Sequence, residues 1–218
     1  MLTESIEFST TALAADARVL EQLATDGYVI VPNFMSSEHC QRLYSYSLGL
    51  GPHQWQQAGI GRADSYTTNS AVRQDKIRWL SSEYLLEQRY LQLMERLRLA
   101  LNGALFMGLF DYECHLAHYP PGAFYRKHLD AFKGRSNRLL STVLYLNDDW
   151  QPQDGGELVI YGEHGQVLET ILPQAGTLVV FLSDEFIHEV KAGRRDRYSI
   201  TGWYRLNTSI GGVVDPTL

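Results

Sequence analysis

The second half of the chain is a succession of short runs rich in β-branched and aromatic residues, each bounded by turn residues. Runs of this length and composition predict strands. About eight short strands in roughly a hundred residues favour a sandwich, barrel or jelly roll over alternating strand–helix units. The predicted strands cover residues 111–119, 123–129, 138–146, 157–161, 166–171, 177–182, 187–191 and 197–205.

The first half of the chain is expected to be mainly helical, because its apolar residues recur at a spacing of three or four. The clearest case is an apolar stripe made of Leu86, Tyr90, Leu93, Leu97 and Leu101. A glycine-dotted segment without periodicity, residues 51–75, is expected to be a functional loop. The predicted elements are helices over residues 13–25, about 36–50 and about 82–102, and a strand over residues 28–31.

The domain organisation follows from the absence of any repeat, low-complexity tract or Pro/Gly/Ser-rich linker. We expect a single domain over residues 1–218, with a helical N-terminal part over about 1–105 and a β core over about 106–207. The helices precede the strands in the chain and are expected to pack against the outside of one sheet. The predicted fold class is mainly β with N-terminal helices.

Composition bears on where the protein works and on the partners that it excludes. A net charge of −6 speaks against nucleic acid as the main partner, because a phosphate-binding surface needs a basic excess. Cys40 and Cys114 lie far apart without CxxC spacing, which indicates two free thiols and a reducing cytosol. Residues 1–20 lack a basic region followed by an apolar run, and no apolar run reaches about 18 residues. We expect a soluble, cytoplasmic protein without a membrane segment.

Three residues of the β core suggest a metal centre. His128 and Asp130 are two residues apart, so on a strand both side chains point to the same face. His188, near the start of a later strand, offers a third ligand. Two histidines and one carboxylate form the facial triad of non-haem iron(II) oxygenases. His-x-Asp alone is a weak signal, and most of the other histidines are expected to be surface or structural: His39, His53, His115, His118 and His164.

The strand after His188 has one largely polar face, to which Arg197, Ser199, Thr201 and Trp203 contribute. The planar guanidinium of Arg197 is suited to hold a carboxylate through two parallel hydrogen bonds. An exposed arginine, or one in a structural ion pair, is the alternative interpretation.

Several motifs between residues 119 and 204 occur together in one order. They are Tyr119-Pro120, Tyr125-x-x-His128-x-Asp130, Tyr145-Leu146-Asn147-x-Asp149-Trp150, Gly155-Gly156-x-Leu158, His188-Glu189-Val190 and Arg197-Tyr198-x-Ile200-Thr201-x-Trp203-Tyr204. Together they resemble the prolyl hydroxylase branch of the iron(II)/2-oxoglutarate oxygenases, especially the hypoxia-inducible-factor prolyl hydroxylases and their bacterial relatives. Upstream, Arg73-x-Asp75-Lys76-Ile77-x-Trp79 is similar to the mobile loop and following strand of that branch.

The resemblance implies an oxygenase domain with a double-stranded β-helix (jelly-roll) core supported by helices on one sheet. It also implies a role for each matching residue. Iron(II) would be held by His128, Asp130 and His188, and 2-oxoglutarate by Tyr119, Tyr145, Leu158, Arg197 and Thr201. Contacts near the substrate proline would come from Tyr125, Arg138 and Trp203, and the loop over the peptide from Arg73 and Asp75. The bland alternative is that Tyr119, Leu158 and Trp203 are plain core residues.

The implied reaction is hydroxylation of a prolyl residue of a protein at C4, with dioxygen as co-substrate and release of succinate and carbon dioxide. No side chain beyond the metal site needs to act as a catalytic residue. Elongation factor Tu is a candidate partner, because bacterial members of this branch act on one of its prolines. Ascorbate dependence is a family expectation, and the sequence does not determine the oligomeric state. The alternatives are a 2-oxoglutarate-dependent hydroxylase of a small molecule, such as a free amino acid, and a non-catalytic metal-binding jelly roll.

Overall fold

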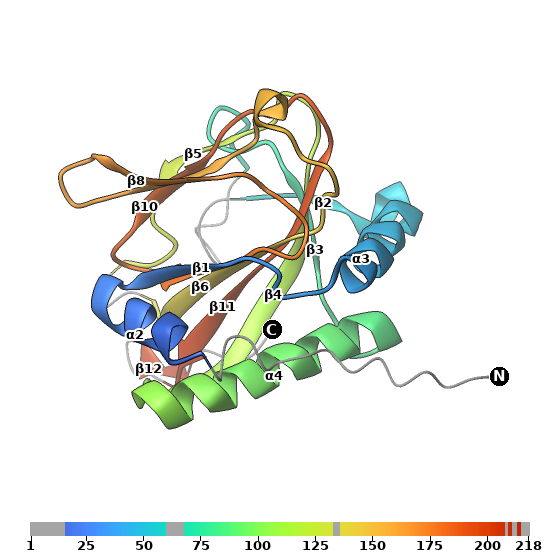
Figure 1. Cartoon of the computed structure of the whole chain (residues 1–218). Helices are drawn as coiled ribbons and strands as arrows, with labels where there is room; N and C mark the ends of the chain where they lie inside the picture. The colour runs from blue at the N-terminus through green and yellow to red at the C-terminus, as the bar shows by residue number, and fades with distance from the viewer. Residues whose placement is uncertain (1–15, 60–67, 133–135, 208, 211–212, 215–218) are drawn as a thin grey trace.

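Two antiparallel sheets face each other, and helices cover the outer side of the larger sheet (Figure 1). The computed structural model describes residues 16–59, 68–132, 136–207, 209–210 and 213–214. The helices are α2 (Ala17–Asp26), α3 (Ser37–Gly49) and α4 (Leu85–Leu105), with the 3-10 turns η1 (Pro52–Gln54) and η3 (Pro152–Asp154).

The larger sheet has seven strands in the order β1-β9-β6-β11-β4-β3-β2. Its strands are β1 (Tyr28–Val31), β2 (Gln56–Gln57), β3 (Lys76–Trp79), β4 (Leu109–Tyr119), β6 (Arg138–Tyr145), β9 (Leu178–Leu182) and β11 (Arg197–Leu206). The smaller sheet has the order β5-β10-β7-β8. Its strands are β5 (Tyr125–His128), β7 (Leu158–Tyr161), β8 (Val167–Ile171) and β10 (Ile187–Val190). A separate pair is formed by β12 (Ser209–Ile210) and β13 (Val213–Val214).

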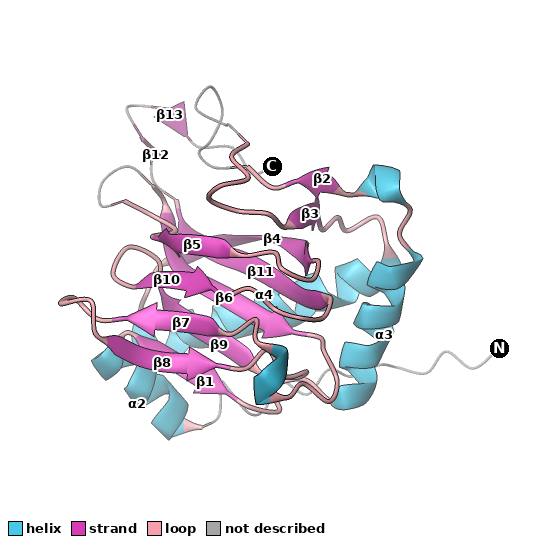
Figure 2. Cartoon of the chain, turned by 90° about the horizontal axis from the view of Figure 1, so that it is seen from above, coloured by secondary structure: helices cyan, strands magenta, loops and turns pink. Residues whose placement is uncertain are grey.

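The chain passes back and forth between the two sheets from β4 to β11. The strands β4, β6, β9 and β11 lie in the larger sheet, and those between them along the chain lie in the smaller sheet, as Figure 2 shows. This winding is a double-stranded β-helix, so the predicted jelly roll is confirmed. All eight strands predicted from the second half of the sequence are present, each within about two residues of its expected limits.

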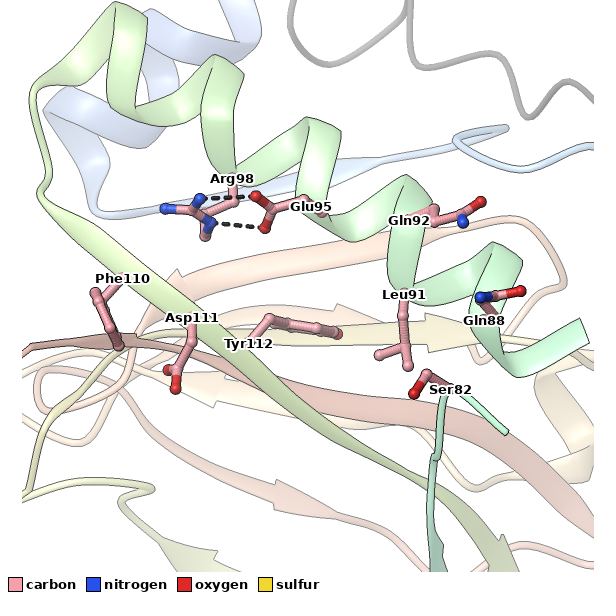
Figure 3. Close-up of a pocket in the computed structure, with 9 residues that line it drawn as sticks. All are labelled: Ser82, Gln88, Leu91, Gln92, Glu95, Arg98, Phe110, Asp111 and Tyr112. Carbon is pink, nitrogen blue, oxygen red and sulfur yellow. Dashed lines mark hydrogen bonds and ion pairs between the residues drawn. The ribbon is translucent and has the colours of Figure 1, made fainter. Parts of the chain in front are cut away.

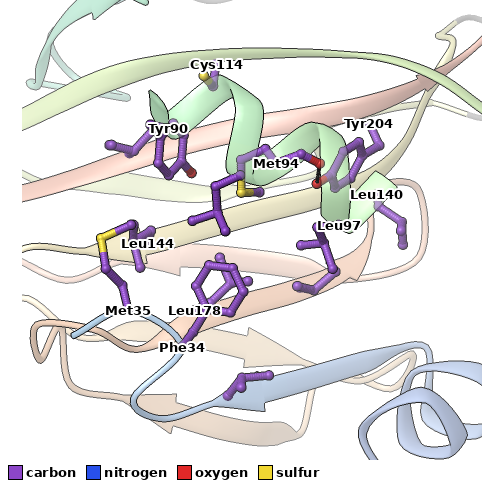
Figure 4. Packing of buried hydrophobic residues seen from close by; sticks show 14 of the residues in the cluster. Phe34, Met35, Tyr90, Met94, Leu97, Cys114, Leu140, Leu144, Leu178 and Tyr204 are labelled. Atoms are coloured by element: carbon purple, nitrogen blue, oxygen red, sulfur yellow. Dashed lines mark hydrogen bonds between the residues drawn. The ribbon is translucent and has the colours of Figure 1, made fainter. Parts of the chain in front are cut away.

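The helical layer forms where the apolar stripes of the sequence predict it. On α4, Tyr90, Met94 and Leu97 are buried against the larger sheet (Figure 4), and Leu93 belongs to the same buried cluster. The hydroxyl of Tyr204 on β11 donates a hydrogen bond of 2.7 Å to the Met94 carbonyl. The helices therefore support one sheet, as expected, and the second core cluster lies between the two sheets.

The helix ends follow local capping chemistry. The Ser36 hydroxyl accepts from the His39 N–H and starts α3, and Gly27 ends α2 with a left-handed φ of 76°. The predicted helix over 82–102 begins instead at Leu85 and continues to Leu105, where Phe106 turns left-handed. Residues 13–15 of the first predicted helix, and most of the stretch in which no targeting segment was expected, lie outside the described residues.

The predicted loop over residues 51–75 contains η1 and β2, and residues 60–67 of it lie outside the described part. Within the described residues, no helix is both long and apolar enough to cross a membrane. Both cysteines are buried and free, as predicted. The single-domain organisation stays a prediction.

Candidate active site

Adjacent strands of the smaller sheet bring three predicted metal ligands together. His128 at the end of β5 and His188 on β10 are direct cross-strand partners, and Asp130 follows two residues after His128. The Nε2 atom of His128 lies 3.5 Å from Oδ1 of Asp130, and the Nε2 atom of His188 lies 3.7 Å from Oδ2. The candidate ligand atoms all lie within 4.8 Å of one another. This spacing suits three donors on one side of a single ion.

Backbone carbonyls orient both imidazoles of this triad. Nδ1 of His128 donates to the Arg126 carbonyl at 2.7 Å, and Nδ1 of His188 donates to the Phe186 carbonyl at 3.0 Å. A carbonyl only accepts, so the ring proton sits on Nδ1 and the Nε2 lone pair faces Asp130. Hydrogen bonds of this kind fix the tautomer that a metal requires.

The charge state of the triad also suits a divalent cation. Burial alone would raise the pKa of Asp130, but the two neighbouring imidazoles, when protonated, and the Ser141 hydroxyl outweigh it and hold the pKa well below its usual range. Burial, and then the nearby His128, lower the pKa of His188 to about 4. At neutral pH the site therefore presents an ionised carboxylate beside a neutral imidazole.

Ser141 on β6 is a site residue that was absent from the sequence prediction. Its hydroxyl donates a 2.6 Å hydrogen bond to Oδ2 of Asp130 and lies 2.9 Å from the Ser183 hydroxyl. A signal was available, because strand alternation puts Ser141 and Tyr145 on the same face of β6. The hydroxyl fixes the carboxylate that the two imidazoles share.

Arg197 lies buried between the sheets, with 2% of its surface exposed. Its Nε atom donates to the Gly156 carbonyl at 2.9 Å, and Nη1 lies 3.5 Å from the Ser199 hydroxyl. Across the described ranges it forms no ion pair, and its buried Nη2 atom has no hydrogen-bond partner. An exposed Arg197 is therefore wrong, and none of the described residues provides the structural ion pair.

Two tyrosines line the same space. The Tyr119 and Tyr145 rings lie 5.0 Å and 5.1 Å from Cζ of Arg197. The Tyr145 hydroxyl is buried without a partner among the described residues. An unsatisfied hydroxyl beside an unneutralised guanidinium calls for an anion with hydrogen-bond acceptors, which is what the distal carboxylate of 2-oxoglutarate offers. The donors of these buried side chains therefore fit the co-substrate.

The other two residues predicted to bind 2-oxoglutarate, Leu158 and Thr201, point less specifically to a ligand than Arg197 and the tyrosines do. Leu158 is fully buried and belongs to the cluster between the sheets, together with Tyr119 and Tyr145. It therefore serves as core whether or not a ligand is bound. Thr201 is half-buried, on the inward face of β11 that also carries Arg197.

The predicted substrate loop lies against β5. Arg73 pairs with Tyr125 in a bridge, and its guanidinium lies 4.3 Å from the centre of the Tyr125 ring. The Tyr125 ring in turn stacks on His128, with centroids 3.5 Å apart. Arg73 also forms two hydrogen bonds of 2.8 Å and 2.6 Å to the buried Asp75. The loop is thus joined to a candidate metal ligand through stacked side chains, and the charges of Arg73 and Asp75 neutralise each other.

The remaining predicted substrate residues, Arg138 and Trp203, contact each other on the larger sheet. The Arg138 guanidinium lies 3.5 Å from the Trp203 ring centre and forms a 2.7 Å ion pair with Glu113. The buried Nε1 atom of Trp203 has no hydrogen-bond partner in the described part of the chain.

A groove on the far side of the larger sheet is separate from this site. It runs between α4 and the start of β4 (Figure 3). The arginine that lines this groove, Arg98, already forms an ion pair of 2.7 Å with Glu95. Nothing in its lining points to a particular ligand.

Comparisons with known proteins identify the family to which this site belongs. Residues 114–205 match the model of the 2OG-Fe(II) oxygenase superfamily. The crystal structure of a prolyl-4-hydroxylase from Pseudomonas putida is 40% identical, with a TM-score of 0.80 over 90% of this chain and 100% of that chain. A prolyl hydroxylase from Trichoplax adhaerens, solved with a peptide of the hypoxia-inducible-factor oxygen degradation domain, is 30% identical. Its TM-score is 0.73, over 86% of this chain and 87% of that chain.

A similarity also extends to a longer animal protein. The hypoxia-inducible factor prolyl hydroxylase of Caenorhabditis elegans is 30% identical over 204 residues, which are 85% of this chain. The chain spans only 27% of the length of that relative.

Proposed function

This chain belongs to the 2OG-Fe(II) oxygenase superfamily, whose enzymes use iron(II), 2-oxoglutarate and dioxygen, and we propose that it hydroxylates a prolyl residue of a protein at C4. One observation carries the proposal. A His-Asp-His cluster and a buried arginine that no described acidic residue pairs with border the same core between the two sheets. The first suits a divalent metal and the second a dicarboxylate, so together they suit the two cofactors of the family.

Each residue then has a defined task. His128, Asp130 and His188 would hold iron, with Ser141 keeping the carboxylate in place. Arg197 would bind the distal carboxylate of 2-oxoglutarate, assisted by the Tyr145 hydroxyl. When bound, iron and 2-oxoglutarate activate dioxygen and supply the oxidising power for hydroxylation, with release of succinate and carbon dioxide. The protein orients these groups and keeps water out, and no side chain is required as a general base.

A prolyl substrate is supported by the named relatives. The Pseudomonas putida and Trichoplax adhaerens proteins are prolyl hydroxylases, and the second was solved with a peptide bound. The sequence resemblance extends to bacterial enzymes that act on elongation factor Tu, which we therefore propose as the protein substrate.

The small-molecule alternative receives less support. A free amino acid needs a second cation for its carboxylate, in addition to the one that binds 2-oxoglutarate. Arg73 and Arg138, the two other arginines placed near the site, are each paired with a carboxylate, Asp75 and Glu113. A non-catalytic module is also disfavoured, because the triad and Arg197 are all in place.

The cofactor part of the proposal is tested under anaerobic conditions. Iron(II) and 2-oxoglutarate together should give a weak visible charge-transfer band in the wild-type protein. His128→Ala should abolish the band, and Arg197→Ala should require far more 2-oxoglutarate to reach it. The exposed His164→Ala and Arg194→Ala variants are matched controls and should leave the band unchanged. A wild-type protein that binds iron without giving the band would contradict the oxygenase assignment.

The substrate part is tested separately with elongation factor Tu. Incubation with the enzyme, iron(II), 2-oxoglutarate and air should add one oxygen atom to one prolyl residue, found as 4-hydroxyproline after hydrolysis. Free proline is the control substrate. Turnover of free proline with no change in the protein would favour the small-molecule alternative.

A further inference from the structure

His115 is a buried histidine that the sequence analysis placed among surface or structural residues. Only 3% of its surface is exposed, so a surface position is wrong. It lies on β4, directly opposite Trp79 on β3 and opposite Thr201 on β11. Strand alternation puts it on the same face of β4 as Tyr119, which means that it faces the space between the sheets.

The rings around His115 hold it in a fixed orientation. Trp79 meets it edge to face, with centroids 5.2 Å apart, and Trp203 lies 5.5 Å away. The charges of Arg73, Asp75 and Arg138 also act on its imidazole. These neighbours include the groups that the family resemblance places around the substrate proline, so His115 lies within the substrate side of the site.

Among the described residues, one nitrogen of the His115 imidazole has a hydrogen-bond partner and the other has none. Nδ1 donates to the Leu116 carbonyl at 3.2 Å, which places the ring proton on Nδ1. Nε2 is then an acceptor, and none of the described residues donates to it. Burial, followed by the nearby Arg73, lowers the pKa of His115 to about 4, so the ring stays neutral at neutral pH.

A peptide substrate can supply the donor that this acceptor lacks. The prolyl nitrogen carries no hydrogen, so the first backbone donor after the reacting residue is the N–H of the next residue. We propose that His115 is a substrate-binding residue whose Nε2 accepts a hydrogen bond from the backbone N–H of the residue that follows the target proline. This assignment rests on the proposed function and deepens it, because it names the part of the peptide that the site recognises.

Three variants separate recognition from structure. His115→Phe keeps an aromatic ring and removes the acceptor, and His115→Gln keeps an acceptor near the position of Nε2. His118→Phe is the matched control, because His118 lies on the opposite face of β4, where its Nε2 is already paired with Asp196 at 2.7 Å. The substrate is a synthetic peptide that spans the prolyl residue hydroxylated in elongation factor Tu. A second peptide has an ester in place of the amide after that proline, which removes the N–H.

For His115→Phe we expect the KM for the peptide to rise about tenfold, with kcat changed less than about threefold. His115→Gln and His118→Phe should remain within about threefold of wild type. The ester should cost the wild-type enzyme about tenfold in KM and cost His115→Phe nothing further, as expected of two changes that remove one interaction. The iron and 2-oxoglutarate charge-transfer band should be unchanged in all variants.

The outcomes are distinct. An unchanged peptide KM in His115→Phe, or equal sensitivity of that variant and the wild type to the ester, overturns the assignment alone. A change in the charge-transfer band of His115→Phe without an ester effect also overturns it, because the residue would then act on the cofactors. A wild-type enzyme that gives the band but hydroxylates no prolyl peptide overturns the proposed substrate and this assignment together.

Discussion

Arg197 carries a positive charge into the space between two sheets, where no acidic side chain of the described residues neutralises it. We expect Arg197→Ala to weaken 2-oxoglutarate binding about 100-fold, because two charge-assisted hydrogen bonds are lost. Arg197→Lys should cost about tenfold, since an ammonium keeps the charge and loses the planar fork. Titration of the anaerobic charge-transfer band measures both. Equal affinity in wild type and Arg197→Ala would show that the distal carboxylate binds elsewhere.

Ser141 acts on the metal site through Asp130 alone. We expect Ser141→Ala to weaken iron(II) binding about tenfold, because the hydroxyl that holds Oδ2 of the carboxylate is removed. Thr142→Val is the matched control. Its hydroxyl lies 2.8 Å from the Tyr112 hydroxyl on the helical side of the same sheet, so this variant should lose stability without losing iron affinity. Competition with a metal-binding dye gives the affinities, and similar losses in both variants would contradict the role of Ser141.

At the scale of elements, Glu87 on α4 ties three segments together. Its carboxylate pairs with Arg78 of β3, and also accepts from the Tyr46 hydroxyl of α3 at 2.6 Å and from the Ser81 N–H at 2.7 Å. Glu87→Ala leaves Arg78 buried without its partner, so we expect a loss of about 3–5 kcal/mol in the free energy of unfolding. The half-exposed Glu95→Ala on the same helix should cost less than about 1 kcal/mol. Urea denaturation measures the free energy of unfolding of both variants. Equal losses would mean that the Glu87 contacts add no more stability than the exposed Glu95–Arg98 pair.

Most elements of the fold were predictable because each has a local cause. The strands of the jelly roll are runs of β-branched and aromatic residues, and α2 and α3 have recognisable caps. The two-residue strands β2, β12 and β13 are too short to carry a periodic pattern, and were missed. The end of α4 was placed three residues early, because Gly103 continues the helix within a sequence that favours a stop there.

In the site, too, some relations between residues could be predicted from the local sequence and others could not. His128 ends β5 and Asp130 lies two residues beyond that strand, and their closeness along the chain is visible in the sequence. The contacts of Ser141 with Asp130, and of His115 with Trp79, depend on the pairing of different strands. That pairing is set by the register across the whole sheet, which the local pattern leaves open. The sequence therefore indicated which residues could bind a metal, and only the fold shows which side chains position them.

At the scale of the whole molecule, acid should destabilise the fold through its buried neutral histidines. The pKa of His115 falls from an ordinary value of 6.5 to about 4 on folding, chiefly because of burial. Between these pH values the unfolded chain binds a proton that the folded chain does not, so stability falls as pH falls. For His115 alone the loss reaches about 3 kcal/mol.

We therefore expect the free energy of unfolding of the metal-free protein to fall less steeply in His115→Phe than in wild type between pH 6.5 and 4. The difference in slope should approach one proton. Urea denaturation at several pH values measures it, with His118→Phe as the control on the other face of β4. Parallel slopes would mean that His115 is protonated in the folded protein.

The two faces of β11 have a consequence for how this chain can change over evolutionary time. Arg197 and Ser199 point to the site, while Tyr198 and Ile200 belong to the core under the helices. Because the side-chain period of a strand is two, inserting one residue before Arg197 would send the arginine into the apolar core under the helices and the tyrosine into the space between the sheets. Single substitutions along β11 keep each side chain on its face of the strand, whereas a single-residue insertion or deletion does not. The same alternation of side chains along β11 therefore sets both the packing of the fold and the co-substrate site, and a shift of one residue would disrupt both.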